Sequence, residues 1–144
     1  MNFRIYLFLF AIGCYQSSCM HRQRNASGVE AAMQNYDRYI LSMNVDSISS
    51  IYTEEGELGN IARGRDSIRK FLARFASFKV LSQISRTDSI LIHKDTAIQS
   101  GTYSQKVIVP GNDTVSVKGL FTAKWIWQRK EGWLIRHMET TPLK

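Results

Sequence analysis

The sequence predicts an α+β fold in which a curved antiparallel sheet packs on three N-terminal helices to form a cone. Three observations predict it. Apolar residues recur at helical spacing through the first half of the chain, as far as Phe75. From Phe78 onward, apolar and polar residues alternate, which is the pattern of strands with one buried face. Turn-forming residues divide this second half into four strands, so a meander follows a block of helices.

Composition is consistent with one domain. The chain has 144 residues, of which 44% are hydrophobic and 22% are charged, enough to bury a sizeable core. Its formal net charge is +7. The lysines and arginines are scattered over several segments without an aromatic-plus-arginine recognition motif, so we expect a basic, solvated surface and no nucleic-acid partner.

The first residues resemble a secretory signal. One positive charge precedes an apolar run over residues 5–12, and a cysteine follows at Cys14. The run is too short for a transmembrane helix, which needs about 20 apolar residues. Residues 11–14, Ala-Ile-Gly-Cys, are similar to a bacterial lipobox, in which the signal is removed before the cysteine and the cysteine is acylated. We therefore expect residues 1–13 to be a signal peptide and Cys14 to carry a lipid anchor.

The lipobox match is incomplete because Ala11 replaces the usual leucine. An ordinary secretory signal and an uncleaved hydrophobic anchor remain as alternatives, and Cys19 is a second candidate for acylation. The lipoprotein interpretation places the protein in a bacterial cell envelope, with residues 14–24 as a polar tether and residues 25–144 as the domain. An ordinary signal would instead make it periplasmic or secreted. Both cysteines precede the domain, so cysteine chemistry inside it is excluded.

The helices are predicted from caps and apolar stripes. The first begins near Asn25 or Ser27, either of which can cap it. Its apolar stripe consists of Val29, Ala32, Met33, Tyr36, Ile40 and Met43. Asp46 is the expected cap of a short second helix, and Asp66 is the expected cap of the third. Residues 54–60 between them form a short strand or loop. The third helix buries Ile68, Phe71, Leu72 and Phe75.

Four strands are predicted after the helices. The first two cover residues 78–92 and 96–109, and a hairpin over residues 114–139 turns at residues 129–132. Gly119 lies on the apolar side of the hairpin's first strand, so we expect the strand to bend there.

The order of these elements, with two short motifs, resembles the nuclear transport factor 2-like superfamily, and most closely its SnoaL-like and ketosteroid-isomerase-like branch. The motifs are Gly-Arg-Asp-Ser-Ile over residues 64–68 and Gly-Trp-x-Ile over residues 132–135. The resemblance covers about residues 25–141. It implies a cone whose sheet and helices enclose a pocket, often in a dimer. It does not imply one function, because members include isomerases, cyclases, dehydratases, non-catalytic subunits and transport factors.

Ketosteroid isomerase, the best-defined activity that this resemblance suggests, uses a general-base aspartate and an oxyanion hole made by a tyrosine and a second aspartate. Aligned on Ile51-Tyr52, Tyr36 matches the tyrosine, while Asn60 and Lys124 fall at or near the two carboxylate positions. An amide cannot take up a proton from carbon, and a lysine cannot replace a neutral carboxylic acid. The sequence therefore argues against this activity.

Strand pairing suggests a different site. If Trp127 opposes Trp133 and Val109 opposes Val115, one face of the sheet gathers several polar groups among aromatic side chains, as in a ligand pocket. The predicted ligand-binding residues are Tyr36, Gln99, Tyr103, Phe121, Trp125, Ile135 and His137, with Glu139 beside them. The alternative is that His137 and Glu139 are paired or solvated at the open end of the sheet, and a one-residue slip would place both on the outer face.

Two function classes follow. We expect a non-catalytic domain that binds a small apolar or amphipathic ligand, or a protein partner, in or around the cone. The alternative is a cofactor-free lyase or isomerase in which His137 is the base, Glu139 orients it, and Tyr36 or Tyr103 donates to developing oxyanion charge.

Cofactor and metal sites are not expected. The three histidines are scattered, and the sequence has no metal-ligand spacing, phosphate-binding loop or nucleophile elbow. A homodimer through the outer sheet face is a further expectation, with a mixed interface. The residues of that face on the central strand are Lys118, Leu120, Thr122, Lys124, Ile126 and Gln128.

Overall fold

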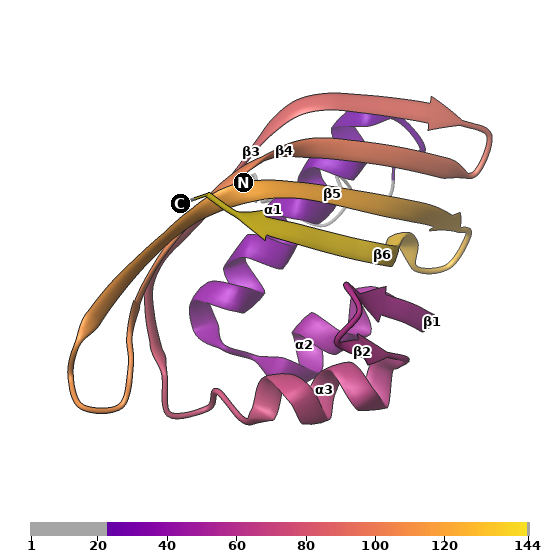
Figure 1. Cartoon of the computed structure of the whole chain (residues 1–144). Coiled ribbons are helices and arrows are strands. Elements are labelled where there is room, and N and C mark those ends of the chain that lie inside the picture. Colours follow the sequence, from indigo (N-terminus) through magenta and orange to yellow (C-terminus); the bar gives the residue numbers. More distant parts are fainter. Residues whose placement is uncertain (1–22, 144) are drawn as a thin grey trace, which may run out of the picture.

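The computed structural model describes residues 23–143, which contain every helix and strand that follows (Figure 1). The elements in chain order are α1 (Ala26–Ser42), α2 (Val45–Ser50), β1 (Tyr52–Leu58), β2 (Ala62–Arg63), α3 (Arg65–Ala73), β3 (Lys79–His93), β4 (Thr96–Ile108), β5 (Thr114–Gln128) and β6 (Gly132–Pro142). The expected signal peptide and Cys14 lie outside the described residues. Within that range, no helix has the length and apolar character needed to cross a membrane.

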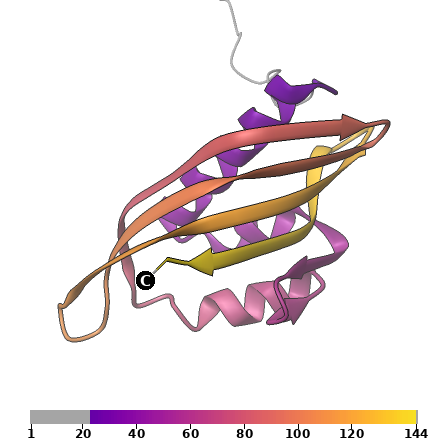
Figure 2. The same ribbon diagram turned by 45° about the horizontal axis from the view of Figure 1, so that its top comes forward.

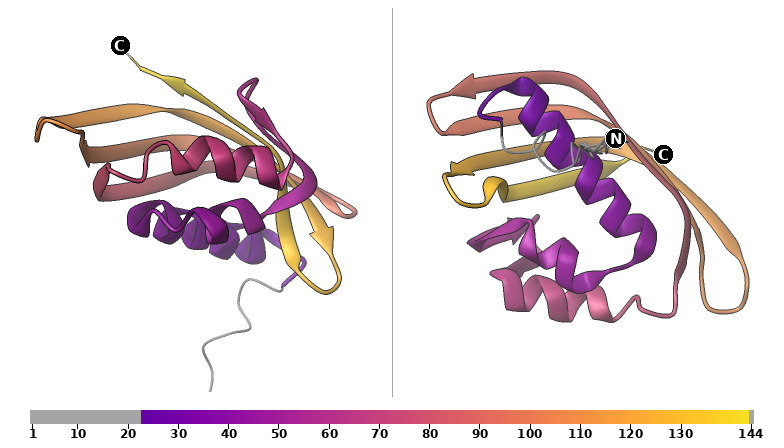
Figure 3. Two further views of the ribbon diagram at one scale, coloured as in Figure 1. Left: turned by 90° about the horizontal axis from the view of Figure 1, so that it is seen from below. Right: turned by 180° about the vertical axis from the view of Figure 1, so that it is seen from behind.

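One curved, unclosed sheet forms the wall of the cone. Its strand order is β2-β1-β6-β5-β4-β3, and the last four strands form the predicted antiparallel meander. The sheet is mixed rather than wholly antiparallel, because β1 pairs with β6 in the parallel direction. Helix α1 lies across the concave side of the sheet, while α2 and α3 lie below it (Figure 2, Figure 3). The predicted α+β cone is therefore confirmed.

The helix starts follow local hydrogen bonding. Asn25 caps α1, since its side-chain oxygen accepts a hydrogen bond from Gly28 N at 3.0 Å. The cap of α2 is Asn44, which accepts from Ser47 N at 3.0 Å, so the prediction of Asp46 is wrong.

The prediction of Asp66 as the α3 cap is also wrong. Gly64 is the residue before α3, with φ 84°, a left-handed conformation that favours glycine, and no side chain caps this end. Asp66 instead lies in the first turn, where its negative charge suits the positive end of the helix dipole.

Gly119 lies in the curved strand β5 and packs closely against Tyr103 (Figure 1). The pairing of β5 with β4 continues through Gly119 without a bulge, with Tyr103 directly opposite it, and the pairing with β6 begins at Gly119. A Cβ atom at Gly119 would lie 2.5 Å from Tyr103 Cε1 and 2.5 Å from Thr141 O. The glycine therefore makes room for an aromatic ring on the neighbouring strand.

A chain of polar groups, buried at Trp125 and Gln99 and partly buried at Thr87 and Glu30, joins α1 to the sheet. Trp125 Nε1 donates a hydrogen bond to Gln99 Oε1 at 2.9 Å, and Gln99 Nε2 donates to Thr87 Oγ1 at 2.8 Å. Thr87 Oγ1 in turn donates to Glu30 Oε2 at 2.5 Å. Gln99 and Trp125 are both 0% exposed, so their polar side-chain atoms depend on these protein partners for hydrogen bonds. Four elements, α1, β3, β4 and β5, are thereby held in one relative position.

We predict that Trp125→Ala lowers the free energy of unfolding by about 3–5 kcal/mol, because it removes a fully buried aromatic side chain and leaves Gln99 Oε1 unpaired. Trp125→Phe keeps most of the apolar area and should fold, with a smaller loss. Denaturant melts measure both. Thr122→Ala, at an exposed position of the same strand, is the control and should change stability by less than about 0.5 kcal/mol. A loss below about 1 kcal/mol for Trp125→Ala would contradict the buried position.

Candidate functional site

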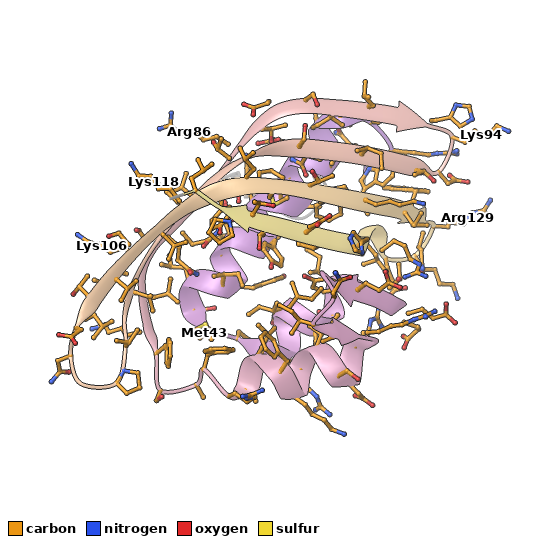
Figure 4. All side chains as sticks on the ribbon, viewed as in Figure 1. Met43, Arg86, Lys94, Lys106, Lys118 and Arg129 are labelled. Atoms are coloured by element: carbon orange, nitrogen blue, oxygen red, sulfur yellow. The ribbon has the colours of Figure 1, made fainter. Side chains whose placement is uncertain are left out.

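An apolar cleft opens between the end of α1, the end of α3 and the sheet. The residues that line it are Ile40 in the last turn of α1 and Met43 just after it, Leu72 near the end of α3 and Phe75 just after it, Phe78 and Val80 at the start of β3, and Gln105 and Val107 from β4. Met43 points into the space between α1 and α3 (Figure 4). The cleft has a volume of about 260 Å³. Ligand pockets usually measure about 300–1,000 Å³, so this cleft suits a small ligand.

Aromatic rings form one wall of the cleft. Phe71 and Phe75 pack edge to face with ring centroids 5.3 Å apart, and Phe75 and Phe78 do the same at 5.2 Å. Edge-to-face packing is a favourable arrangement of aromatic rings. It connects the last turns of α3 to the segment that enters β3, and so gives the cleft a defined wall.

The cleft contains little polarity. Gln105 is the only polar residue among the described residues that line it, and none of them carries a titratable side chain. A side-chain amide can donate and accept hydrogen bonds, but it cannot act as a general base near neutral pH. The lining is therefore suited to hold an apolar molecule with one polar group.

Two of the predicted ligand-binding residues adjoin the cleft. Tyr36 lies one helical turn before Ile40, on the same side of α1, and Tyr103 lies two residues before Gln105, on the same side of β4. Both are partly buried and pack against the core. Neither lines the cleft itself.

Behind Tyr36 lies Tyr52, the first residue of β1. Their rings pack edge to face, with centroids 6.4 Å apart. Tyr52 is buried, and its hydroxyl has no hydrogen-bond partner within residues 23–143. Burial raises the pKa of Tyr52 well above its usual 10.0, and the neighbouring Tyr36 adds to this rise. Burial also raises the pKa of Tyr36. Both phenols are therefore neutral at physiological pH.

Four other predicted residues form closed core rather than cleft. Gln99, Phe121, Trp125 and Ile135 all point to the inner side of the sheet, as predicted, and all are buried. The predicted pairing of β4 with β5 is wrong by two residues, because Val115 opposes Val107 and not Val109. A shift of two residues keeps every side chain on its predicted face, which explains why the faces are correct although the partners are not.

His137 and Glu139 do not share the face of Trp125. The predicted pairs Trp127 with Trp133 and Trp125 with Ile135 are confirmed, but the register then shifts and Lys124 opposes His137. The extra residue in β6 is Arg136, a β-bulge that turns the following side chains to the other face. The predicted pocket position of both residues is therefore wrong.

Glu57, which the sequence prediction missed, is the main partner of His137. Glu57 Oε2 lies 3.1 Å from His137 Nδ1, and Glu57 Oε1 lies 3.4 Å from Arg136 Nη1 and 3.6 Å from Arg63 Nε. The hydrogen bond with His137 and the charge of Arg136 lower the pKa of Glu57. Glu139 Oε2 is farther away, at 3.9 Å from His137 Nε2. These half-exposed charges link β1 to β6 on the surface and lie outside the cleft.

The geometry defines a class of protein: an α+β cone with a small apolar cleft at its open end and neutral phenols beside it. No protein-family model matches the sequence. No curated protein matches it either.

Several solved structures have a similar fold. A ketosteroid isomerase-like protein from Erwinia carotovora atroseptica has a TM-score of 0.71 and 13% identity, covering 81% of this chain and 94% of that one. A nuclear transport factor 2-like superfamily protein from Salmonella enterica serovar Typhimurium has a TM-score of 0.68 and 13% identity, covering 81% and 89%. A candidate scytalone dehydratase from Novosphingobium aromaticivorans has a TM-score of 0.67 and 15% identity, covering 81% and 82%. The chain has the nuclear transport factor 2-like fold.

The sequence contained only part of the signal for the cleft. Leu72 and Phe75 belong to the predicted apolar stripe of α3, and Ile40 and Met43 belong to that of α1. What the stripes could not show is that both helices end where the sheet curves away. The lining residues of β3 and β4 were consequently not identified as site residues.

We predict that Tyr52→Phe leaves the free energy of unfolding at neutral pH unchanged or raises it by up to about 1 kcal/mol, because it removes a buried hydroxyl that has no partner. Denaturant melts measure the effect. Tyr39→Phe, at a partly exposed position of α1, controls for the loss of a hydroxyl as such. A loss of about 1 kcal/mol or more for Tyr52→Phe would show that the hydroxyl has a hydrogen-bond partner.

The same variant tests the raised pKa of Tyr52. A raised folded-state pKa contributes stability that is complete below the unfolded-state pKa of about 10 and is lost as pH rises through the folded-state pKa. Wild-type stability should therefore fall on the alkaline side of about pH 10, and the fall should be smaller in Tyr52→Phe. Equal slopes for the two proteins would contradict the proposed burial of a neutral phenol.

Proposed function

We propose that this protein binds a small apolar or amphipathic molecule in the cleft at the open end of its cone, and that the cleft binds without catalysing a reaction. The observation that carries the proposal is the lining of the cleft, in which seven side chains are apolar and Gln105 alone is polar. Such a site favours burial of an apolar molecule, while one amide orients a single polar group.

The names of similar structures include an isomerase-like protein and a dehydratase candidate, and these names belong to those proteins. For this chain, acid–base catalysis in the cleft would need a titratable group within hydrogen-bond reach of the ligand. His137 is on the opposite face of the sheet, and Tyr36 and Tyr52 are neutral. Binding is therefore favoured over the lyase or isomerase alternative.

We also propose that the protein is exported and held in a bacterial cell envelope by a lipid on Cys14. The support is the basic start, the short apolar run and the lipobox-like residues 11–14. A tether is compatible with the fold because the first helix begins at Ala26, after the lipid-anchored segment has ended.

We predict that Leu72→Trp weakens binding of the fluorescent apolar dye anilinonaphthalene sulfonate by roughly tenfold or more, because the larger side chain fills the space that a ligand would occupy. Fluorescence titration of the purified protein measures it. Native mass spectrometry of the wild type and of Leu72→Trp, purified in parallel, shows whether a small molecule is retained only when the cleft is open.

Leu41→Trp is the matched control. Leu41 is 45% exposed on α1 and does not line the cleft, so the same change of side chain should leave dye affinity within about twofold. Equal weakening in both variants, or undiminished binding in Leu72→Trp, would remove the cleft as the binding site.

A separate prediction concerns the anchor. Wild-type protein expressed in a bacterial host should partition into the detergent phase, and Cys14→Ala should move to the aqueous phase because it lacks the acylated thiol. Cys19→Ala is the control and should partition like the wild type. If Cys14→Ala and the wild type partition alike, Cys14 does not carry a lipid.

A further inference from the structure

We propose that the end of the domain formed by the β3–β4 and β5–β6 turns faces the membrane and binds an anionic lipid bilayer. We call this surface the hairpin-end patch, and its residues are Leu91, Ile92, Lys94, Ile98, Arg129 and Lys130. The orientation rests on the N-terminal membrane attachment proposed above. The binding of lipid by the patch is independent of that attachment, and it can be measured on protein without a lipid anchor.

The described chain begins at this end of the molecule. The backbone oxygen of Gln23 accepts a hydrogen bond from Trp133 Nε1 at 2.9 Å, at the start of β6. Arg24 forms an ion pair of 2.6 Å with Asp95, in the turn between β3 and β4. Figure 3 shows the start of α1 beside these turns. A membrane attachment that precedes Gln23 is therefore attached to the hairpin end.

The connection to Cys14 is short. Residues 14–22 can span at most about 30 Å, since an extended chain covers about 3.3–3.6 Å per residue. Strand β5 contains 15 residues and is roughly 50 Å long along its path at about 3.3 Å per residue. A lipid on Cys14 would thus hold the hairpin end nearer to the bilayer than the other end of the sheet. The same end would face the bilayer if the apolar run of residues 5–12 remained as an uncleaved anchor.

The two turns lie side by side and carry positive charge. Trp127 N donates a hydrogen bond to Asp95 O at 2.7 Å, which joins the β3–β4 turn to the end of β5. Lys94 and Arg129 project from this end (Figure 4). Within residues 23–143, neither they nor Lys130 form an ion pair.

The acidic groups of the two turns already have cationic partners. Asp95 pairs with Arg24 at 2.6 Å, and Glu131 pairs with Arg65 at 3.3 Å. The three cations of the patch are therefore not neutralised by the acids beside them. This charge is complementary to the surface of a bilayer that contains anionic lipids.

Exposed apolar side chains lie beside these cations. Leu91 is 70% exposed, and its partner across the strand pair, Ile98, is 38% exposed. Ile92, next to the turn, is 39% exposed. Surfaces that bind bilayers combine apolar groups that enter the headgroup boundary with Lys and Arg residues that attract anionic lipids. The hairpin-end patch has both features at the end of the molecule to which the tether leads.

The opposite end of the sheet supplies a matched control. Arg86, Lys106 and Lys118 are one arginine and two lysines, as in the patch, and they project from the other end of the sheet (Figure 4). All six cations are exposed, and within the described residues none of these three forms an ion pair either. Replacing either set with glutamine removes three positive charges from the protein. A difference in vesicle affinity between the two variants therefore depends on where the charges lie and not on net charge.

The experiment uses the chain from residue 14 with Cys14→Ser, because every helix and strand lies between Ala26 and Pro142. Cosedimentation is measured with vesicles of phosphatidylcholine, and with vesicles in which part of it is replaced by phosphatidylglycerol. We expect binding to the anionic vesicles only. Each lysine or arginine near an anionic surface strengthens binding roughly fivefold, so K94Q/R129Q/K130Q should bind about 100-fold more weakly, while R86Q/K106Q/K118Q should change affinity by less than about threefold.

An apolar variant tests the second component of the patch. Leu91→Ser should weaken binding by about tenfold through loss of an inserted side chain, and Leu120→Ser, equally apolar and 47% exposed on β5, should not. Equal effects of the two triple variants, or no binding of the parent chain to anionic vesicles, would overturn the proposal. These results are independent of detergent partitioning, so loss of the anchor and loss of the patch are distinguished.

Discussion

The position of α1 on the sheet is the constraint on which the rest of the structure depends. The buried amide of Gln99 lies between the helix and three strands, and hydrogen bonds link it to buried Trp125 and to the partly buried Thr87 and Glu30. Buried polar groups without partners are costly, so a shift of α1 by one turn would leave several of them unpaired. Apolar packing alone would tolerate more than one placement of the helix. The hydrogen-bonded chain selects one, and with it the position of Ile40 and Met43 at the open end of the cone.

Local patterns in the sequence predicted part of the fold, and contacts between distant segments determined the rest. Alternation of apolar and polar residues specified the four long strands and their inner faces, and Trp125 proved to be completely buried. The parallel pairing of β1 with β6 could not be predicted, because it joins segments far apart in the chain and no turn fixes its register. The bulge at Arg136 could not be predicted either, because the sequence around it has the composition of an ordinary strand. Its one extra residue turns His137 to the other face of the sheet.

The candidate site was predicted less well than the fold for a related reason. The predicted pocket followed the buried faces of β4 and β5, but side chains in the middle of these strands fill the interior and leave no space. The apolar cleft instead forms where elements end and diverge, between the ends of α1 and α3, the first residues of β3 and the last residues of β4. Helical and strand periods describe the middle of an element well and its ends poorly. A cleft made by four element ends therefore has a weak signal in the sequence, although each lining residue is individually apolar.

The two proposed surfaces lie at opposite ends of the sheet, and this separation bears on how a ligand would arrive. Val80 and Val107, which line the cleft, are paired near one end of β3 and β4, while His93 and Thr96 are paired at the other end, beside the hairpin-end patch. With that patch on a bilayer, the cleft would lie at the end of the sheet that is farther from the membrane. A ligand would then enter from the aqueous side and not by lateral diffusion from the lipid. This arrangement favours a molecule with measurable solubility in water over a membrane lipid, in agreement with the small volume of the cleft and with the amide of Gln105 at its wall.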